Sequence, residues 1–277
     1  MSEYKDYDQK TLTKLHQVQI ELLDEFVRIC EKHNLTYFLI YGTLLGAVRH
    51  QGFIPWDDDI DVGMPRSDYD KFLKIAPTEL DSKYFLDCLE YNDDYYLPFA
   101  KIKKNGTIFD EEISHCLNNH KGIFMDIFPL ENVYANNVFL KYHSLMAFSI
   151  TDTIFYKQKM KTLKNTIHPI IVRCLSILPK KSLQHIQRKH MTYCHDDNSM
   201  YMSVLGAGYG YRKDVNLRSN IMPPKKVIFA GKEYNGMHDN DQYLKHIYGN
   251  YLELPPVEKR RNHMPLEIDF GKNKKVK

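Results

Sequence analysis

Four aspartates occur within five positions just after the chain's only tryptophan, in the stretch WDDDID that begins at Trp56. If this stretch forms a strand, Asp59 and Asp61 point to one side of it, while Ile60 and Val62 point into the core. Two carboxylates held that close raise each other's pKa or bind a cation, and an oxygen-binding dication such as Mg²⁺ is the usual solution. The spacing therefore predicts a metal site, with Mn²⁺ as the alternative ion.

Two further stretches could complete a phosphate site with these aspartates. Asp126 lies in the same apolar-aspartate-apolar setting, Met125-Asp126-Ile127, so a neighbouring strand can bring a third carboxylate to Asp59 and Asp61. Gly42-Thr43 follows an apolar run and precedes a helical pattern, where backbone N–H groups bind anions and a glycine lets a phosphate approach. Carboxylates that hold a metal opposite such N–H groups are the parts of a metal-assisted phosphoryl-transfer site.

Other interpretations of the acidic stretch stay open. It could be a solvated turn, since charged residues are mostly exposed, although the interleaved apolar residues count against this. Asp57, Asp59 and Asp61 also have the first spacings of a calcium-binding loop. The sixth position of that loop is Val62 instead of Gly, and the twelfth is Asp68 instead of Glu, so the match fails at two positions.

Two smaller questions concern the neighbours of the proposed ligands. Asp57 and Asp58 either support the metal ligands or lie at the surface, and we name Asp58 as a candidate substrate-binding residue. Zinc is a further alternative, because Cys116 and His120 have a suitable spacing and Cys194-His195 could add two ligands. Zinc ligands usually occur in closer pairs, which counts against this alternative.

Several elements must position these residues. Residues 10 to 33 carry apolar side chains at intervals of three and four, which predicts an amphipathic helix. The run TYFLIY at 36 to 41 predicts a buried strand, and Thr43 is expected to cap a short helix through Val48.

A second buried strand is predicted at 59 to 64, followed by a helix from Ser67 through Ile75. Further strands are predicted at 84 to 90, 95 to 103, 107 to 112 and 122 to 128. From 134 to 195 the pattern is helical, with prolines at 169 and 179 interrupting it. The tail predicts turns, short strands within 225 to 234, and a helix capped near Asp239 and ending at Tyr248.

These elements define the expected architecture. The fold class is α/β (α+β): a mixed β-sheet core with flanking helices and an added helical layer. We expect three units, namely a catalytic core with the N-terminal helix at 1 to 133, a basic helical layer at 134 to 200, and a C-terminal α/β extension at 201 to 277 that completes the site.

Composition limits the class of protein. The 277 residues, 43% of them hydrophobic, can bury a sizeable core. No apolar run is long enough for a signal peptide or a spanning helix, which predicts a cytoplasmic protein. The five cysteines form no CxxC pair, which favours reduced thiols over disulfides, and a net charge of +3 is too small to indicate nucleic-acid binding.

Longer blocks of the sequence resemble a known family. The stretch Gly42 to Met64 resembles the nucleotidyltransferase-superfamily pattern of a Gly-Ser/Thr turn, a spacer and Asp-apolar-Asp-apolar. More closely, the chain resembles the LicD family in five blocks, which occur in order between about 40 and 265. They read YGTLLGAVRHQGFIPWDDDIDV, RSDYDKF, FAKIKKNGT, GIFMDIFPLENV and YLKHIYGNYLELPP.

The resemblance implies a nucleotidyltransferase-like core in which Asp59, Asp61 and Asp126 are the catalytic residues and metal ligands. LicD-like proteins are associated with moving phosphocholine from CDP-choline to sugars of bacterial cell-surface polymers such as teichoic acid or lipopolysaccharide. On that basis Mg²⁺ at Asp59 and Asp61 would bridge the donor's diphosphate, and CMP would leave. Asp126 would either hold a second metal ion or take the proton from the sugar hydroxyl.

The resemblance also implies basic substrate-binding residues. Lys101 and Lys103 in FAKIKKNGT match the family's basic pair, and Arg49 matches the GAVRH block; Gly42 and Thr43 complete the set. The family often has arginine at the position of Lys103, so this chain loses bidentate phosphate binding there. The structural alternatives are sheet-surface charges for the two lysines and a helix cap for Arg49.

Choline is a quaternary ammonium, which proteins bind with aromatic faces. Trp56 is the candidate we place in the substrate site, and four tyrosines lie near the matching blocks, although aromatic residues mainly serve burial. These tyrosines are Tyr95, Tyr96, Tyr209 and Tyr211.

Other functions stay open. The donor could carry ethanolamine or a polyol, or the enzyme could transfer a nucleotidyl group from a nucleoside triphosphate and release pyrophosphate. A non-catalytic glycan- or membrane-binding protein would not need the three aspartates or the Gly-Thr turn.

Basic charge is concentrated in one segment. No acidic residue occurs between Asp152 and Asp196, whereas nine lysines and arginines do. The same segment carries apolar residues such as Ile170 and Ile177, so it could lie on the inner, anionic face of a membrane that presents a lipid-linked acceptor. The alternative is a helix layer with a solvated basic face.

Overall fold

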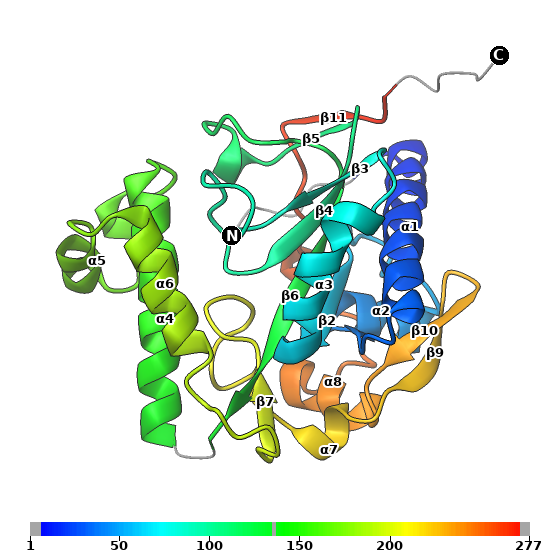
Figure 1. The fold of residues 1–277 in the computed structure, drawn as a ribbon. Coiled ribbons are helices and arrows are strands. Elements are labelled where there is room, and N and C mark those ends of the chain that lie inside the picture. Colours follow the sequence, from blue (N-terminus) through cyan, green and yellow to red (C-terminus); the bar gives the residue numbers. More distant parts are fainter. Residues whose placement is uncertain (1–6, 135–136, 272–277) are drawn as a thin grey trace.

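A long N-terminal helix covers the core of the protein. The computed structural model describes residues 7 to 134 and 137 to 271 (Figure 1). Helix α1 (Gln9–Lys32) confirms the helix predicted over 10 to 33, and Asp8 caps it by accepting a hydrogen bond from the Thr11 N–H at 2.9 Å. Its apolar stripe is buried and packs against the central strands of the sheet, as the spacing of three and four requires.

A seven-stranded mixed sheet forms the centre of the molecule and confirms the predicted α+β fold class (Figure 1). The main path is β1-β2-β6-β4-β3, and the long strand β6 continues beyond it to pair with β7, which pairs with β8. The strands of this sheet are β1 (Phe38–Leu39), β2 (Asp61–Pro65), β3 (Tyr84–Asp87), β4 (Ala100–Lys104), β6 (Phe124–Val133), β7 (Tyr201–Ser203) and β8 (Asn216–Leu217).

The register of the sheet brings charged residues together. Strands β2 and β6 run parallel with Asp61 opposite Asp126, and β4 runs antiparallel to β6 with Lys101 opposite Asp126. Residues opposite each other on adjacent strands share a face. Ile60 and Val62 are completely buried, which fixes the face to which the neighbouring aspartates point.

Two helices flank β2, and their starts differ from the predictions. Helix α2 (Tyr41–His50) begins before Thr43 and has Ile40 at its N-cap, so the prediction that Thr43 caps it is wrong. Helix α3 (Arg66–Glu79) begins one residue before Ser67 and extends beyond Ile75. Both differences arise because the strand end and Pro65 set the helix start, not a capping side chain.

The predicted helical layer consists of α4 (Asn137–Lys157), α5 (Pro169–Leu175) and α6 (Lys180–Met191), with a 3₁₀ turn at Leu163–Asn165. The interruptions fall at the two prolines, since Pro169 opens α5 and Pro179 is the N-cap of α6. The helices α4 and α6 pack side by side, apart from the helices that flank the sheet (Figure 1). The division of the chain into three units stays a prediction, and its first boundary adjoins residues 135 and 136, which lie outside the described residues.

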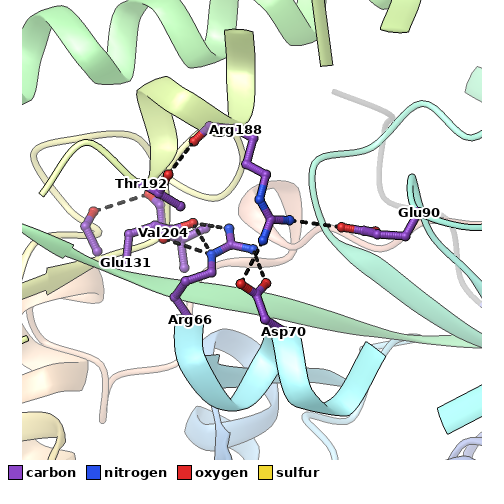
Figure 2. A network of polar contacts seen from close by, with 8 residues as sticks. Arg66, Asp70, Glu90, Glu131, Arg188, Thr192 and Val204 are labelled. Atoms are coloured by element: carbon purple, nitrogen blue, oxygen red, sulfur yellow. Dashed lines mark hydrogen bonds and ion pairs between the residues drawn. The ribbon is translucent and has the colours of Figure 1, made fainter. Parts of the chain in front are cut away.

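A network of ion pairs joins α6 to the core (Figure 2). Arg188 on α6 contacts Asp70 on α3 at 2.7 Å and Glu90 at 3.0 Å. Asp70 also pairs with Arg66, whose guanidinium in turn pairs with the buried Glu131 on β6. The helical layer is therefore held to α3 and the sheet by alternating charges.

The C-terminal part returns to the core. Helix α8 (Asn240–Tyr248) starts at Asp239, whose carboxylate accepts from the Gln242 N–H, which confirms the predicted capped helix. The other elements are α7 (Arg218–Ile221), the hairpin β9 (Lys225–Phe229) and β10 (Lys232–Gly236), a 3₁₀ turn at Val257–Lys259, and β11 (Glu267–Asp269). Strand β11 pairs with β5 (Ile108–Asp110), which precedes a 3₁₀ turn at Glu112–Ser114. Within the part of the chain that the structure describes, no helix is both long and apolar enough to cross a lipid bilayer.

Candidate active site

An open cleft of about 780 Å³ lies beside the start of α2 and the ends of β2 and β6. We divide its lining residues by type into two groups, which we call the acidic side and the basic side. The acidic side contains Asp57, Asp59, Asp61 and Asp126, together with Tyr41 and Gly42. The basic side contains Arg49, Trp56, Tyr209, Tyr248, Lys259, Arg260, Arg261 and His263.

The acidic side comes from an alternating segment. Strand β2 begins only at Asp61, but the preceding residues keep the alternation, so Asp57, Asp59 and Asp61 all line the cleft. Asp58 and Ile60 point the other way and are fully buried. The pairing of Asp59 with Asp61 on one face is thus as predicted, and Asp57 joins them.

Asp58 does not lie in the cleft, so the structure does not support its prediction as a substrate-binding residue. Its carboxylate accepts hydrogen bonds from the Tyr7 hydroxyl at 2.7 Å and from the His263 backbone N–H at 2.8 Å. Its backbone carbonyl accepts from Gln19 on α1 at 2.7 Å. Asp58 therefore fastens the C-terminal segment and α1 to the acidic segment.

The start of α2 presents backbone N–H groups to the cleft. Tyr41 and Gly42 line the cleft, and the N-cap residue Ile40 makes no side-chain hydrogen bond to the first amides of this helix, so the Gly42 amide is a candidate for binding an anion. A Cβ atom on Gly42 would lie 2.8 Å from Asp57 Oδ2, so any other residue at this position would displace the Asp57 carboxylate. Thr43 is buried, and its hydroxyl accepts the Asp61 N–H at 2.8 Å, which positions Asp61.

The two predicted lysines have different partners. Lys101 Nζ lies 2.7 Å from Asp126 Oδ1 and 3.4 Å from the centre of the Phe124 ring, so it positions the third carboxylate of the cleft. Lys103 Nζ lies 2.7 Å from Asp87 and donates to the His120 carbonyl. Neither lysine lines the cleft, so the substrate-binding roles of Lys101 and Lys103 stay predictions that this geometry does not favour.

The basic side is formed mostly by the segment that follows α8. The Arg260 guanidinium lies 4.1 Å from the centre of the Trp56 ring, and Arg49 donates to the Tyr251 carbonyl at 2.6 Å. The hydroxyls of Tyr209 and Tyr248 form a hydrogen bond of 3.0 Å, and both residues line the cleft. Of the tyrosines predicted as aromatic candidates, only Tyr209 lines this cleft, whereas Tyr95 and Tyr96 are core residues.

The four carboxylates of the acidic side outnumber the cationic groups that form ion pairs with them, which are Lys101 and His263 among the described residues. Burial and the charges of Asp59, Asp126 and Asp57 hold the pKa of Asp61 well above its ordinary value. The pKa of Asp57 is raised for the same reasons, and burial raises that of Asp126 to about 6 despite Lys101. Burial acts to raise the pKa of Asp59 as well, but the hydrogen bond and charge of His263 lower it.

The donor set fits a hard divalent cation. Among the described residues no ion pair neutralises Asp57 or Asp61, and carboxylate oxygens are the ligands that Mg²⁺ and Mn²⁺ prefer. The ligand atoms of Asp58, Asp59 and His263 also lie within 4.8 Å of one another. A metal ion there would have to displace the hydrogen bonds that Asp58 already accepts. Asp59, Asp61 and Asp126 line one cleft, but their ligand atoms do not all lie within that distance of one another in this structure, so their role as metal ligands stays a prediction.

The alternative metal sites find no support. Residues 61 to 65 form a strand and α3 follows directly, which is not the loop of a calcium-binding helix-loop-helix. No three of Cys116, His120, Cys194 and His195 lie close enough together to share a zinc ion.

The sequence interpretation missed His263, Arg260 and Tyr248. His263 Nδ1 lies 3.3 Å from Asp59 Oδ2 although the two residues are far apart in the chain. Nothing in local spacing indicates such a contact, whereas the block YLKHIYGNYLELPP did mark the helix that carries Tyr248.

Comparisons with known proteins agree with this geometry. Residues 34 to 176 match the family model described as "LicD/FKTN/FKRP, nucleotidyltransferase domain", and this range contains every acidic residue of the cleft's acidic side. Over 260 residues the chain is 29% identical to "Lipopolysaccharide cholinephosphotransferase LicD" of Haemophilus influenzae, a match that covers 91% of this chain and 96% of that protein.

Two shorter similarities involve uncharacterised rickettsial proteins. The chain is 44% identical over 119 residues to one from Rickettsia prowazekii, covering 43% of this chain and 41% of that protein. It is 46% identical over 57 residues to one from Rickettsia typhi, covering 21% and 18%.

Proposed function

This chain belongs to the LicD family, and from that premise we propose that it transfers phosphocholine from CDP-choline to a hydroxyl of a cell-surface glycan, releasing CMP. The observation that carries the proposal is the cleft itself, in which four carboxylates face arginine, lysine and aromatic side chains. The similarity to a lipopolysaccharide cholinephosphotransferase supports choline as the transferred alcohol and lipopolysaccharide as the acceptor class, with teichoic acid as the alternative polymer.

The acidic side is where the donor's diphosphate would be held. Asp59 and Asp61 would hold Mg²⁺, or Mn²⁺, which would neutralise charge on the diphosphate as the phosphorus–oxygen bond to CMP breaks. The N–H groups at the start of α2 would bind phosphate oxygens directly, and Gly42 keeps their approach open.

Acceptor activation involves Asp126. The acceptor hydroxyl forms the new phosphorus–oxygen bond and loses its proton, and Asp126 either takes that proton or holds a second metal ion. Lys101 fixes the Asp126 carboxylate at 2.7 Å in both cases. The basic side, with Arg49, Arg260 and Lys259, would stabilise the leaving CMP phosphate.

Choline requires aromatic surface close to negative charge. Tyr209 and Tyr248 provide such surface on the cleft, whereas Arg260 lies over one face of Trp56, so Trp56 would have to bind choline with its other face. The arrangement would also accept ethanolamine or a polyol, so the donor has to be tested directly.

The test is CMP release from CDP-choline with Mg²⁺ and a lipopolysaccharide or teichoic-acid acceptor, compared between wild type, Asp61→Asn and Asp93→Asn. Asp93 is a matched control, because its side chain is 76% exposed and pairs only with exposed Lys181. We expect acceptor-dependent release that Asp61→Asn abolishes and Asp93→Asn leaves intact. Release from CDP-ethanolamine or a CDP-polyol alone would overturn choline.

A second candidate is nucleotidyl transfer, because the matching family model is described by a nucleotidyltransferase domain. It would use the same aspartates but attack the α-phosphate of a nucleoside triphosphate. Pyrophosphate release without CMP release from any CDP donor would establish this reaction instead.

A further inference from the structure

Helix α5 exposes an apolar face on the helical layer. Ile170, on α5, is 81% exposed, and Ile177, two residues beyond the end of α5, is 84% exposed. Val172, on the opposite side of α5 from Ile170, is fully buried, so it holds the helix to the layer while Ile170 faces outward. Ile167, which precedes α5, is also 60% exposed. We call Ile167, Ile170 and Ile177 the α5 face.

Basic residues are concentrated in the segment of the chain that contains the α5 face. The segment from 153 to 195 contains no acidic residue, and Arg173 lies between Ile170 and Ile177 on α5. Of its nine lysines and arginines, only Lys161, Lys181 and Arg188 form ion pairs with carboxylates of the described residues. The charges of Lys157, Lys159, Lys164, Arg173, Lys180 and Lys189 are left without a carboxylate partner there.

A groove shares lining residues with both the α5 face and the active-site cleft. It has a volume of about 410 Å³ and runs along α4, where Leu145 and Phe148 line it. Its lining includes Ile167 of the α5 face as well as Gly208 and Tyr209. Gly208 and Tyr209 also line the active-site cleft, so the two hollows lie next to each other at this loop.

We propose that the α5 face docks on an anionic lipid bilayer, so that a membrane-borne acceptor reaches the active-site cleft along this side of the protein. The exposed isoleucines would enter the boundary of the acyl chains. The lysines and arginines without a carboxylate partner would contact the anionic headgroups. The groove makes the surface relevant to catalysis, because its lining includes both Ile167 of the α5 face and two residues of the cleft. The inference rests on the proposed function for its purpose, but its test requires no turnover.

The experiment is flotation of the full chain with vesicles of phosphatidylglycerol and phosphatidylcholine, compared with phosphatidylcholine alone. We expect binding to the anionic vesicles only, weakening between about 0.1 and 1 M salt as charge is screened. The variant Ile170→Ser/Ile177→Ser should bind at least about tenfold more weakly, since each isoleucine loses its transfer into the acyl boundary. Ile228→Ser is the matched control, because Ile228 is an exposed isoleucine on β9, away from α5 (Figure 1).

The outcomes separate this proposal from the proposed function. Asp61→Asn should float like wild type, and the double isoleucine variant should keep full CMP release with a soluble glycan acceptor while losing it with an acceptor embedded in vesicles. Absence of wild-type flotation, or equal flotation by the double variant, would overturn the proposal. The proposal would also be overturned if sedimentation showed that the wild type is a dimer and that the double isoleucine variant is a monomer. The α5 face would then be the contact between two copies of the chain.

Discussion

Neutralising Asp61 should stabilise the protein when no metal is present, while removing its response to metal. Asp61 lies on the cleft without an ion-pair partner in the described residues, next to Asp59 and opposite Asp126. Its pKa is raised by burial and by these carboxylates, so the charged form is unfavourable in the folded state. Asp61→Asn keeps the shape of the side chain and the hydrogen bond from the Asp61 N–H to Thr43, and removes only the charge.

The size of the expected stabilisation follows from the distance between adjacent strands of the sheet. Adjacent strands lie about 4.8 Å apart, and two unit charges at that separation repel by about 3 kcal/mol at an effective dielectric constant of about 20. Lys101 offsets part of the charge of Asp126, so the net gain in unfolding free energy is on the order of 1 to 3 kcal/mol. For a chain of this size each kcal/mol raises Tm by about 2 to 4 °C.

The sign of the pH dependence is fixed by the direction of the shift. Because the pKa of Asp61 is raised on folding, the folded state binds its proton more tightly than the unfolded chain does. Wild-type stability is therefore lost as pH rises above the ordinary carboxyl pKa of about 4, and the advantage of Asp61→Asn should be larger at pH 8 than at pH 5.

The assay is thermal unfolding in EDTA and then with increasing Mg²⁺. Wild type should gain stability with Mg²⁺, by about 2.7 kcal/mol at a hundredfold excess over Kd, and Asp61→Asn should gain little. Asp93→Asn is the control and should behave like wild type in both conditions. If Asp61→Asn melts below wild type in EDTA at pH 8, or if Mg²⁺ raises both Tm values equally, the reasoning about this carboxylate cluster is wrong.

Three further predictions address other parts of the structure. Gly42→Ala should cut CMP release at least about tenfold, because its Cβ would lie 2.8 Å from Asp57 Oδ2, whereas Gly52→Ala, with no atom nearer than 3.8 Å, should not. Arg188→Gln should lower the unfolding free energy measured in urea by about 1 kcal/mol, since its pairs with Asp70 and Glu90 are partly exposed; the neighbouring Lys189→Gln should have no effect (Figure 2). Burial raises the pKa of Asp214 to about 7, so wild-type stability should fall as pH rises from about 4 to 7, and Asp214→Asn should flatten this slope in unfolding measured across that range.

Local patterns predicted the acidic side of the cleft well. The alternation of aspartates with Ile60 and Val62 is a two-residue period, and burial of the apolar partners fixes the direction of the others. Asp126 followed from the same argument, and the parallel register of β2 and β6 brings it opposite Asp61. Helix α1 was predicted for a related reason, because a long amphipathic stripe leaves little choice of structure.

The structure gives some side chains other partners than the sequence analysis expected. Thr43 could have capped α2, but its hydroxyl accepts the Asp61 N–H instead. Lys103 could have reached substrate, but Asp87 is completely buried and requires a positive partner. Asp58 could have joined the cleft, but the alternation that places Asp57 and Asp59 there turns it to the opposite side.

The part of the basic side that follows α8 could not be predicted, because it reaches the cleft through contacts between distant segments. Three polar contacts attach the segment after α8 to the acidic half: the His263 N–H donates to Asp58, Arg260 lies over Trp56, and Arg49 donates to the Tyr251 carbonyl. Each contact joins a residue before position 60 to one after position 250, so neither half shows the cleft in its own sequence. The aspartates of the cleft repel one another, and His263 and Arg260 of this C-terminal segment bring positive charge to them. The position of the segment therefore affects how far the negative charge of the cleft is neutralised. Substrate binding and docking of the C-terminal segment are therefore expected to be linked.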